Sequence, residues 1–204
     1  MRIGFDFDNT IIEYKDLFYT EALKHGFIKG EKDPTKSIIR KHFVDINREE
    51  IFTQIQAEVY GRSIEKGIIS NDLVYLINKL HNEGHKIFIV SHKTKYPISG
   101  QNYNLREAAL KWLMKQTICG ENKPINRKNI YFESTKEEKA KRIEQLNIEI
   151  YIDDLLEIVK MLNPNIIGLL YNPENNFLNW PKEKTIVQWE YEKISRFIEK
   201  NQYE

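Results

Sequence analysis

Two aspartates one residue apart, Asp6 and Asp8, close a short apolar run at the start of the sequence. In an extended segment side chains alternate between faces, so both carboxylates leave the same side while Phe7 turns away into packing. Carboxylates this close repel each other and raise a pKa unless a cation or a proton-transfer role balances them. The spacing therefore indicates metal or acid–base chemistry, with an acidic turn as the plain alternative.

Two later apolar runs also end in groups that can handle phosphate. Residues 87–90 lead into Ser91, whose hydroxyl can donate to a phosphate oxygen. Residues 148–152 lead into a second acidic pair, Asp153 and Asp154. Each signal is weak alone, but together they predict a site for a phosphate ester and a cation.

A helix predicted between these two runs carries a lysine on its buried face. Ser134 and Thr135 each precede a glutamate by three residues, a pattern typical of a helix N-terminus. Lys139 and Ile143 then share one face, where an ammonium group is costly to bury without an anion. Lys136 lies on the same face, so the residues alone leave both lysines open.

In this order the residues resemble the haloacid dehalogenase-like (HAD) superfamily of phosphohydrolases, and the resemblance covers residues 1 to about 190. The matches are Asp6 to Thr10 for the DxDxT motif, Ser91 for the second motif, Lys139 for the motif III lysine, and Asp153-Asp154 for the acidic fourth motif. By resemblance, the spacing to the fourth motif favours Lys139 over Lys136. Many members carry a further acid where this chain has Ile158, so Glu157 is the candidate for it.

Charge placement and the resemblance together imply a role for each residue. Asp6 would attack phosphorus and form an aspartyl-phosphate, and Asp8 would act as general acid and then as general base. Ser91 and Lys139 would hold the phosphoryl oxygens. Mg²⁺ is the expected cofactor. The residues that the resemblance places at the metal are Asp6, Asp8 through its backbone carbonyl, Asp154 and, in support, Asp153.

Several residues beside these motifs are expected to contact the substrate. They are Asn9, Thr10, His92, Lys93 and Arg62. A solvated basic loop is an equal alternative for Lys93 and Arg62, and a structural histidine is an equal alternative for His92.

The acid at position 8 narrows the reaction. By resemblance, dehalogenases and phosphonate-cleaving members lack an acid there, so Asp8 favours phosphomonoester hydrolysis, with mutase-type phosphotransferase activity as the alternative. A non-catalytic binding protein of the same fold would be expected to have lost Asp6, Asp8 or the fourth motif, and this chain keeps all of them.

Composition sets further limits. The 204 residues fit one core domain with a modest insertion. The net charge is +1, from 31 basic and 30 acidic residues, so the composition does not indicate a basic surface that would bind nucleic acid or membranes. A nucleic-acid end phosphatase is therefore disfavoured, and a small-molecule phosphate ester is the expected partner. The single cysteine, Cys119, and the lack of a long apolar run favour a cytoplasmic protein.

The chain alternates strands and helices, which predicts an α/β fold with a Rossmann-like, three-layer parallel sheet core. Strands are expected near 2–7, 86–91, 129–132, 149–152, 166–170 and 185–188, and helices over 72–82, 104–116, 135–146, 155–162 and 190–200. In such sheets ligands bind beyond the carboxyl ends of the strands, at the point where the strand order reverses. The motif residues fall at those ends.

Residues 14–70 are too long for a simple crossover and predict a small α-helical cap inserted after the first strand. The apolar stripes at helical spacing are Leu17, Phe18, Ala22 and Leu23, then Ile51, Ile55 and Val59. The expected domains are a core of residues 1–13 and 71–204 and a cap of residues 14–70. Such a cap would close over the phosphate site and exclude water.

Overall fold

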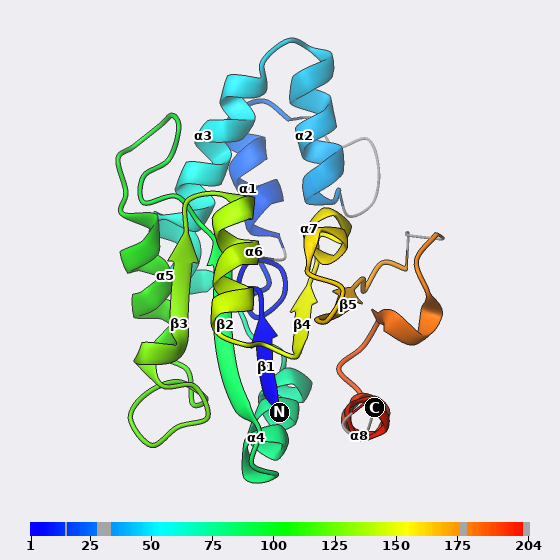
Figure 1. Ribbon diagram of the computed structural model, residues 1–204. Coiled ribbons are helices and arrows are strands. Elements are labelled where there is room, and N and C mark those ends of the chain that lie inside the picture. Colours follow the sequence, from blue (N-terminus) through cyan, green and yellow to red (C-terminus); the bar gives the residue numbers. More distant parts are fainter. Residues whose placement is uncertain (15, 28–33, 176–178, 202–204) are drawn as a thin grey trace. The chain divides into compact units, whose positions relative to one another are not determined.

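The computed structural model describes residues 1–14, 16–27, 34–175 and 179–201 (Figure 1). The chain divides into two compact units. Unit 1 comprises Met1–Glu13, Ile69–His92 and Gln116–Glu204, and unit 2 comprises Tyr14–Ile68 and Lys93–Lys115. In the described part of the chain, no helix combines the length and the apolar character needed to cross a membrane.

Unit 1 is built on a six-stranded sheet in the order β3-β2-β1-β4-β5-β6, with every neighbouring pair parallel. The strands are β1 (Arg2–Phe5), β2 (Lys86–His92), β3 (Ile130–Glu133), β4 (Ile150–Asp153), β5 (Ile167–Tyr171) and β6 (Thr185–Ile186). The strand order reverses between β1 and β4, which are hydrogen-bonded neighbours. This is the switch point at which such sheets bind ligands.

Helices cover both faces of this sheet because its strands are apolar on both sides. The helices of unit 1 are α4 (Asn71–Asn82), α6 (Lys136–Gln145), α7 (Leu156–Met161) and α8 (Tyr191–Lys200), with 3-10 turns at Arg127–Asn129 and Lys182–Lys184. Phe88 and Val90 of β2 pack with Ile143 of α6 and Ile158 of α7 in one buried cluster. The helices α4 and α8 pack against each other, and α4 also contacts β2. Continuous apolar strands covered in this way are typical of parallel sheets.

The fold class expected from the sequence is confirmed. Each of the expected strands and helices is present, with its ends within three residues of the expected positions. The agreement follows from strong local signals: Ser70 and Asn104 cap the N-termini of α4 and α5 (Leu105–Leu113) through their side chains, as Ser and Asn do at helix starts.

Unit 2 is helical. Its helices are α1 (Leu17–Lys24), α2 (Lys36–Asp45), α3 (Glu49–Tyr60) and α5, with the 3-10 turn η1 at Arg62–Lys66. Phe18 of α1 stacks on Phe52 of α3 with the ring centroids 6.1 Å apart. The stripe of Ile51, Ile55 and Val59 is buried as expected.

Two features of unit 2 differ from what the sequence predicts. The apolar stripe of α1 is only partly buried. Phe18 and Ala22 lie in the core, whereas Leu23 is 47% exposed. Residues 93–115, with α5, belong to unit 2 and not to the sheet-containing unit. The sequence gives no composition change that marks this second segment, because it follows β2 directly.

Candidate active site

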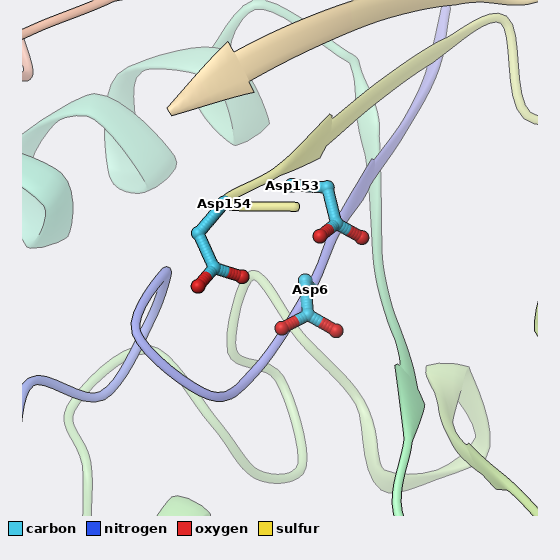
Figure 2. A group of neighbouring side chains, drawn as sticks. All are labelled: Asp6, Asp153 and Asp154. Atoms are coloured by element: carbon cyan, nitrogen blue, oxygen red, sulfur yellow. The ribbon is translucent and has the colours of Figure 1, made fainter. Parts of the chain in front are cut away.

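Three carboxylates converge at the carboxyl ends of β1 and β4. The Asp6 backbone N–H donates to the carbonyl of Ile152 at 2.8 Å, so β1 pairing continues up to the first motif residue. Asp153 ends β4 and Asp154 follows it. One carboxylate oxygen from each of Asp6, Asp153 and Asp154 lies within 4.8 Å of the others, and Figure 2 shows the three side chains pointing toward a common space.

Lys139 from α6 is bound between two of these carboxylates. Its Nζ donates to Asp6 Oδ1 at 2.5 Å and to Asp153 Oδ2 at 2.6 Å, and the residue is 1% exposed. The side chain of Thr135 and that of Glu138 form a capping box that starts α6. The capping box, which the sequence predicts, therefore fixes where α6 begins and so the position of Lys139 in the helix.

The rival lysine has a different partner. Lys136 pairs with Glu157 at the surface, where the Glu157 side chain is 63% exposed. The structure thus brings Lys139 to the carboxylate cluster and Lys136 to Glu157. Among the described residues, the carboxylates that could share a cation are Asp6, Asp153 and Asp154, and Glu157 is not one of them.

The ring of Tyr151 lies beneath Lys139, a contact that the sequence alone does not predict. Lys139 Nζ lies 5.5 Å from the Tyr151 ring centroid, and the Tyr151 hydroxyl donates to the Val90 carbonyl at 2.5 Å. Gly4 of β1 makes room for this ring, because a Cβ at Gly4 would lie 2.7 Å from Tyr151 Cδ2. A glycine inside an apolar strand is the signal for such a close approach.

Burial and charge set the protonation of the cluster. Burial raises the pKa of Asp6 to about 7; the Lys139 ammonium opposes this rise, and the carboxylates of Asp153 and Asp8 add to it. Burial disfavours the charge on Lys139, but Asp6 and Asp153 outweigh it and raise the pKa of Lys139 above its usual value. The Lys139 ammonium contacts Asp6 and Asp153, and an oxygen of Asp154 lies within 4.8 Å of oxygens of both, an arrangement that could hold a metal ion.

The loop after Asp6 attaches the first motif to the fourth. Asn9 adopts a left-handed conformation with φ 58°, which asparagine tolerates, and its N–H donates to the Ile12 carbonyl at 2.9 Å. Its side-chain Nδ2 donates to Asp154 Oδ2 at 3.2 Å. Phe7 is buried, and its ring lies 6.1 Å from that of Phe132, as the alternation of faces predicted. Asn9 therefore helps to orient Asp154.

No known protein family matches this sequence, and no curated protein matches it. Solved structures do match. A haloacid dehalogenase-like family hydrolase from Xanthomonas campestris aligns with a TM-score of 0.57 at 8% identity, over 100% of this chain and 98% of that one. A HAD-superfamily hydrolase from Ehrlichia chaffeensis aligns with a TM-score of 0.52 at 15% identity, over 98% and 96%.

A third structure, the archaeal beta-phosphoglucomutase from Pyrococcus sp. strain ST 04, aligns with a TM-score of 0.54 at 12% identity, over 98% of this chain and 99% of that one.

 The chain has the fold of the HAD-superfamily hydrolases. The resemblance read from the sequence motifs is thereby confirmed at the level of the fold.

In this HAD fold, the remaining residues expected at the site in unit 1 lie as follows. Ser91 is buried in β2, opposite Phe132 of β3. Asp8 is partly exposed and forms an isolated bridge with Ile12. The Thr10 hydroxyl is buried, and none of the described residues forms a hydrogen bond with it. These placements leave the roles of Ser91, Asp8 and Thr10 as predictions.

His92 has a structural contact. Its Nε2 donates to the Ser134 carbonyl at 3.0 Å, which ties the end of β2 to the residue before the α6 N-cap. This contact fits the alternative that the sequence left open for His92, a hydrogen-bonded structural histidine.

Two further expected substrate contacts, Lys93 and Arg62, belong to unit 2. Lys93 is 3% exposed, and its Nζ lies 4.6 Å from the Tyr60 ring centroid. Arg62 is exposed, pairs with Glu58 at 3.1 Å and lines an open cavity of about 210 Å³. The solvated-loop alternative therefore does not describe Lys93.

The donor set of the HAD core suits a hard divalent cation. Asp6, Asp153 and Asp154 offer carboxylate oxygens, the donors that hard divalent cations prefer. Lys139 already occupies one oxygen each of Asp6 and Asp153.

Proposed function

We propose that this protein is a Mg²⁺-dependent phosphomonoesterase that acts on a small phosphorylated metabolite through an aspartyl-phosphate at Asp6. The observation that carries the proposal is the binding of Lys139 Nζ to both Asp6 and Asp153 within a cluster of three carboxylates. A buried ammonium and a cation site beside one carboxylate are what a dianionic phosphate needs in order to approach an anionic nucleophile.

The charges of the site explain how the chain would favour the reaction. Lys139 stabilises the ionised form of Asp6 and can contact a phosphoryl oxygen as charge builds up there. Bound at Asp6 and Asp154, Mg²⁺ would neutralise the phosphate charge that otherwise repels the nucleophile. The Ser91 hydroxyl would donate to a second phosphoryl oxygen.

The proposed reaction consists of two displacements at phosphorus. An oxygen of Asp6 forms a bond to phosphorus as the bond to the ester oxygen breaks, and Asp8 gives its proton to the leaving oxygen. Asp8 then takes a proton from a water molecule that attacks the same phosphorus, which releases inorganic phosphate and restores the Asp6 carboxylate. Asp8 lies two residues after the nucleophile on a loop that the Asn9 contacts hold in place.

Residues 14–70 are proposed as the cap that selects the substrate. They supply most of unit 2, which is helical and separately packed. A compact helical insertion after the first core strand is the kind of element that excludes water and adds contacts to the leaving group. Residues 93–115 belong to the same unit and are included in this proposal.

The proposal is tested with purified protein and p-nitrophenyl phosphate. We expect phosphate release with Mg²⁺, loss of release in EDTA, and recovery when Mg²⁺ is added in excess of the chelator. Full activity in EDTA would remove the metal from the mechanism, and absence of turnover with aryl and alkyl phosphates would refute the phosphatase proposal.

Transfer to an acceptor other than water is the second candidate, favoured by the structural likeness to a beta-phosphoglucomutase. The same assay separates the two when a sugar phosphate is added as acceptor. Hydrolysis releases one inorganic phosphate for each nitrophenol, whereas transfer releases less inorganic phosphate than nitrophenol. We expect equal amounts.

A further inference from the structure

The side chain of Tyr151 reaches across the central strand of the sheet in unit 1. Among the described residues it is the largest side chain that is fully buried. Tyr151 belongs to β4 and pairs there with Gly4 of β1, where the missing side chain leaves room for the ring. Beyond β1, the Tyr151 hydroxyl donates to the Val90 carbonyl of β2 at 2.5 Å. One side chain therefore connects three neighbouring strands.

The hydroxyl contact lies directly before the serine of the second motif. Phe5 and Ile89 are the last pair between β1 and β2, and Val90 is the next residue of β2. The carbonyl that Tyr151 binds belongs to the peptide group that joins Val90 to Ser91. A peptide group is planar, so a hydrogen bond to its oxygen restricts the orientation of the whole group. The Tyr151 hydroxyl thus restricts the backbone that carries the Ser91 hydroxyl.

The ring of the same side chain contacts the other group proposed to hold the phosphate. Lys139 Nζ lies 5.5 Å from the Tyr151 ring centroid while it donates to Asp6 and Asp153. An ammonium group at this distance is attracted to an aromatic ring. Two acceptors restrict Nζ only to a circle around the line that joins them, so the ring supplies a third point of contact.

Close packing holds the ring itself in place. Tyr151 lies in the buried cluster that includes Val90 of β2, Ile143 of α6 and Ile158 of α7. Side chains in such interiors interdigitate and stay in well-defined rotamers, so they transmit a displacement and do not absorb it. The ring is therefore a fixed support for Lys139, and a change at position 151 should be transmitted to the lysine.

The helix α6 carries a second cation over a second tyrosine ring. The guanidinium carbon of Arg142 lies 5.2 Å from the Tyr131 ring centroid, and Arg142 pairs with Glu133 at 2.7 Å. Tyr131 is partly buried against the same cluster as Tyr151. Among the described residues, the carboxylates that could share a cation do not include Glu133. Tyr131 therefore offers a matched control for Tyr151.

We propose that Tyr151 is a positioning residue for phosphoryl transfer to Asp6, holding Lys139 through its ring and the peptide group before Ser91 through its hydroxyl. The inference rests on the proposed phosphatase function and extends it, because it makes the spacing of two phosphate-binding groups depend on one core side chain. Groups that act in a transition state must be held within about 0.5 Å of the productive geometry. A small displacement therefore lowers kcat more than it weakens substrate binding.

Two substitutions at Tyr151 separate its contacts, with p-nitrophenyl phosphate and Mg²⁺ in the assay. Tyr151→Phe keeps the ring and loses one hydrogen bond, so kcat should fall about tenfold. Tyr151→Leu loses both contacts, so kcat should fall about 10²-fold or more. KM should change by no more than about threefold in either variant, because the contacts act in the transition state.

Tyr131→Phe and Tyr131→Leu are the matched controls and should leave kcat unchanged, whatever stability they lose. Urea unfolding identifies the concentration range in which each variant is folded, and kinetics are measured without denaturant. If Tyr151→Leu fails to fold, Tyr151→Phe, which lacks a single oxygen atom, decides the question.

The affinity for two oxyanions provides a readout that a merely structural role would not change. Orthovanadate adopts the five-coordinate geometry of the transition state, whereas inorganic phosphate is tetrahedral like the product. Calorimetric titration in Mg²⁺ measures both without turnover. In the Tyr151 variants the Kd of vanadate should rise by about the factor by which kcat/KM falls, and the Kd of phosphate by about threefold or less.

The outcomes separate this inference from the proposed function. Wild-type kcat in both Tyr151 variants, or equal losses of affinity for vanadate and phosphate, would overturn the positioning role and leave the phosphatase proposal intact. An equal loss of kcat in the Tyr131 variants would also overturn it. A wild-type protein that neither hydrolyses the ester nor binds vanadate would refute the phosphatase proposal and the positioning role together.

Discussion

Lys139 and Lys136 stand three residues apart on α6, yet their surroundings differ in burial and in charge. Lys139 is buried between Asp6 and Asp153, whereas Lys136 forms one ion pair with Glu157 at the surface. An exposed pair of this kind contributes about 0–1 kcal/mol. Removal of a buried partner leaves carboxylates without compensation and costs several times more.

The first prediction at this scale compares the two lysines. Lys139→Ala should lower kcat/KM for an aryl phosphate by about 10²-fold or more, as expected for the loss of a charged contact in the transition state. Lys136→Ala should cost much less and serves as the control on the same helix. Lys139→Met, which keeps most of the volume, should show the same loss. The reverse order would transfer the catalytic role to Lys136.

The second prediction separates the roles of Asp6 and Asp8. Asp6→Asn should abolish both turnover and the covalent intermediate, because an amide is a poor nucleophile toward phosphorus. Asp8→Asn should still be phosphorylated by an activated aryl phosphate but should lose phosphate slowly, since water attack needs a base. Acid quenching during turnover and intact-mass measurement should detect a phosphate adduct only with Asp8→Asn. Near-normal turnover by Asp6→Asn would contradict its assignment as nucleophile.

The charged residues of the site could be predicted from the sequence, whereas their aromatic support could not. Asp6, Asp153 and Asp154 each end or follow an apolar run, so their meeting at one edge of a parallel sheet follows from topology alone. Tyr151 lies within such a run and is indistinguishable there from a core residue.

At the scale of elements, β1 and β4 are held in register with a glycine opposite a tyrosine. Gly4 pairs with Tyr151, and β1 also pairs with β2 on its other side. The strands could be predicted because their apolar runs are long and end in polar residues. The register could not, because the pattern of continuous apolar strands is compatible with shifts along a neighbour.

Gly4→Ala tests this contact. The added methyl group would lie 2.7 Å from Tyr151 Cδ2 and 2.9 Å from Ile148 Cδ1, both in the buried core, so we expect a loss of about 1–3 kcal/mol of stability. Displacement of the Tyr151 ring should also lower kcat/KM, since Lys139 lies over that ring. Urea unfolding and steady-state kinetics measure the two effects. Tyr151→Leu in the Gly4→Ala background should recover part of the stability, and an additive second loss would contradict the overlap.

At the scale of the whole molecule, both units are assembled from separate stretches of chain. Unit 2 takes one segment after β1 and a second after β2. The sequence predicted the first segment, because more than fifty residues with helical apolar stripes are too many for a crossover. The second contains a single helix, α5, and resembles an ordinary connection between two core strands.

The sheet order also sets when the carboxylate cluster can form during synthesis of the chain. The strand β1 is made first, but its neighbours are paired through Arg2 with Lys86 and through Ile3 with Ile150. Such distant pairings fold slowly, and an apolar strand without neighbours is prone to aggregate. Asp6 therefore leaves the ribosome long before Lys139 and Asp153, so a nascent chain cannot assemble the site until β4 has been translated and has docked beside β1.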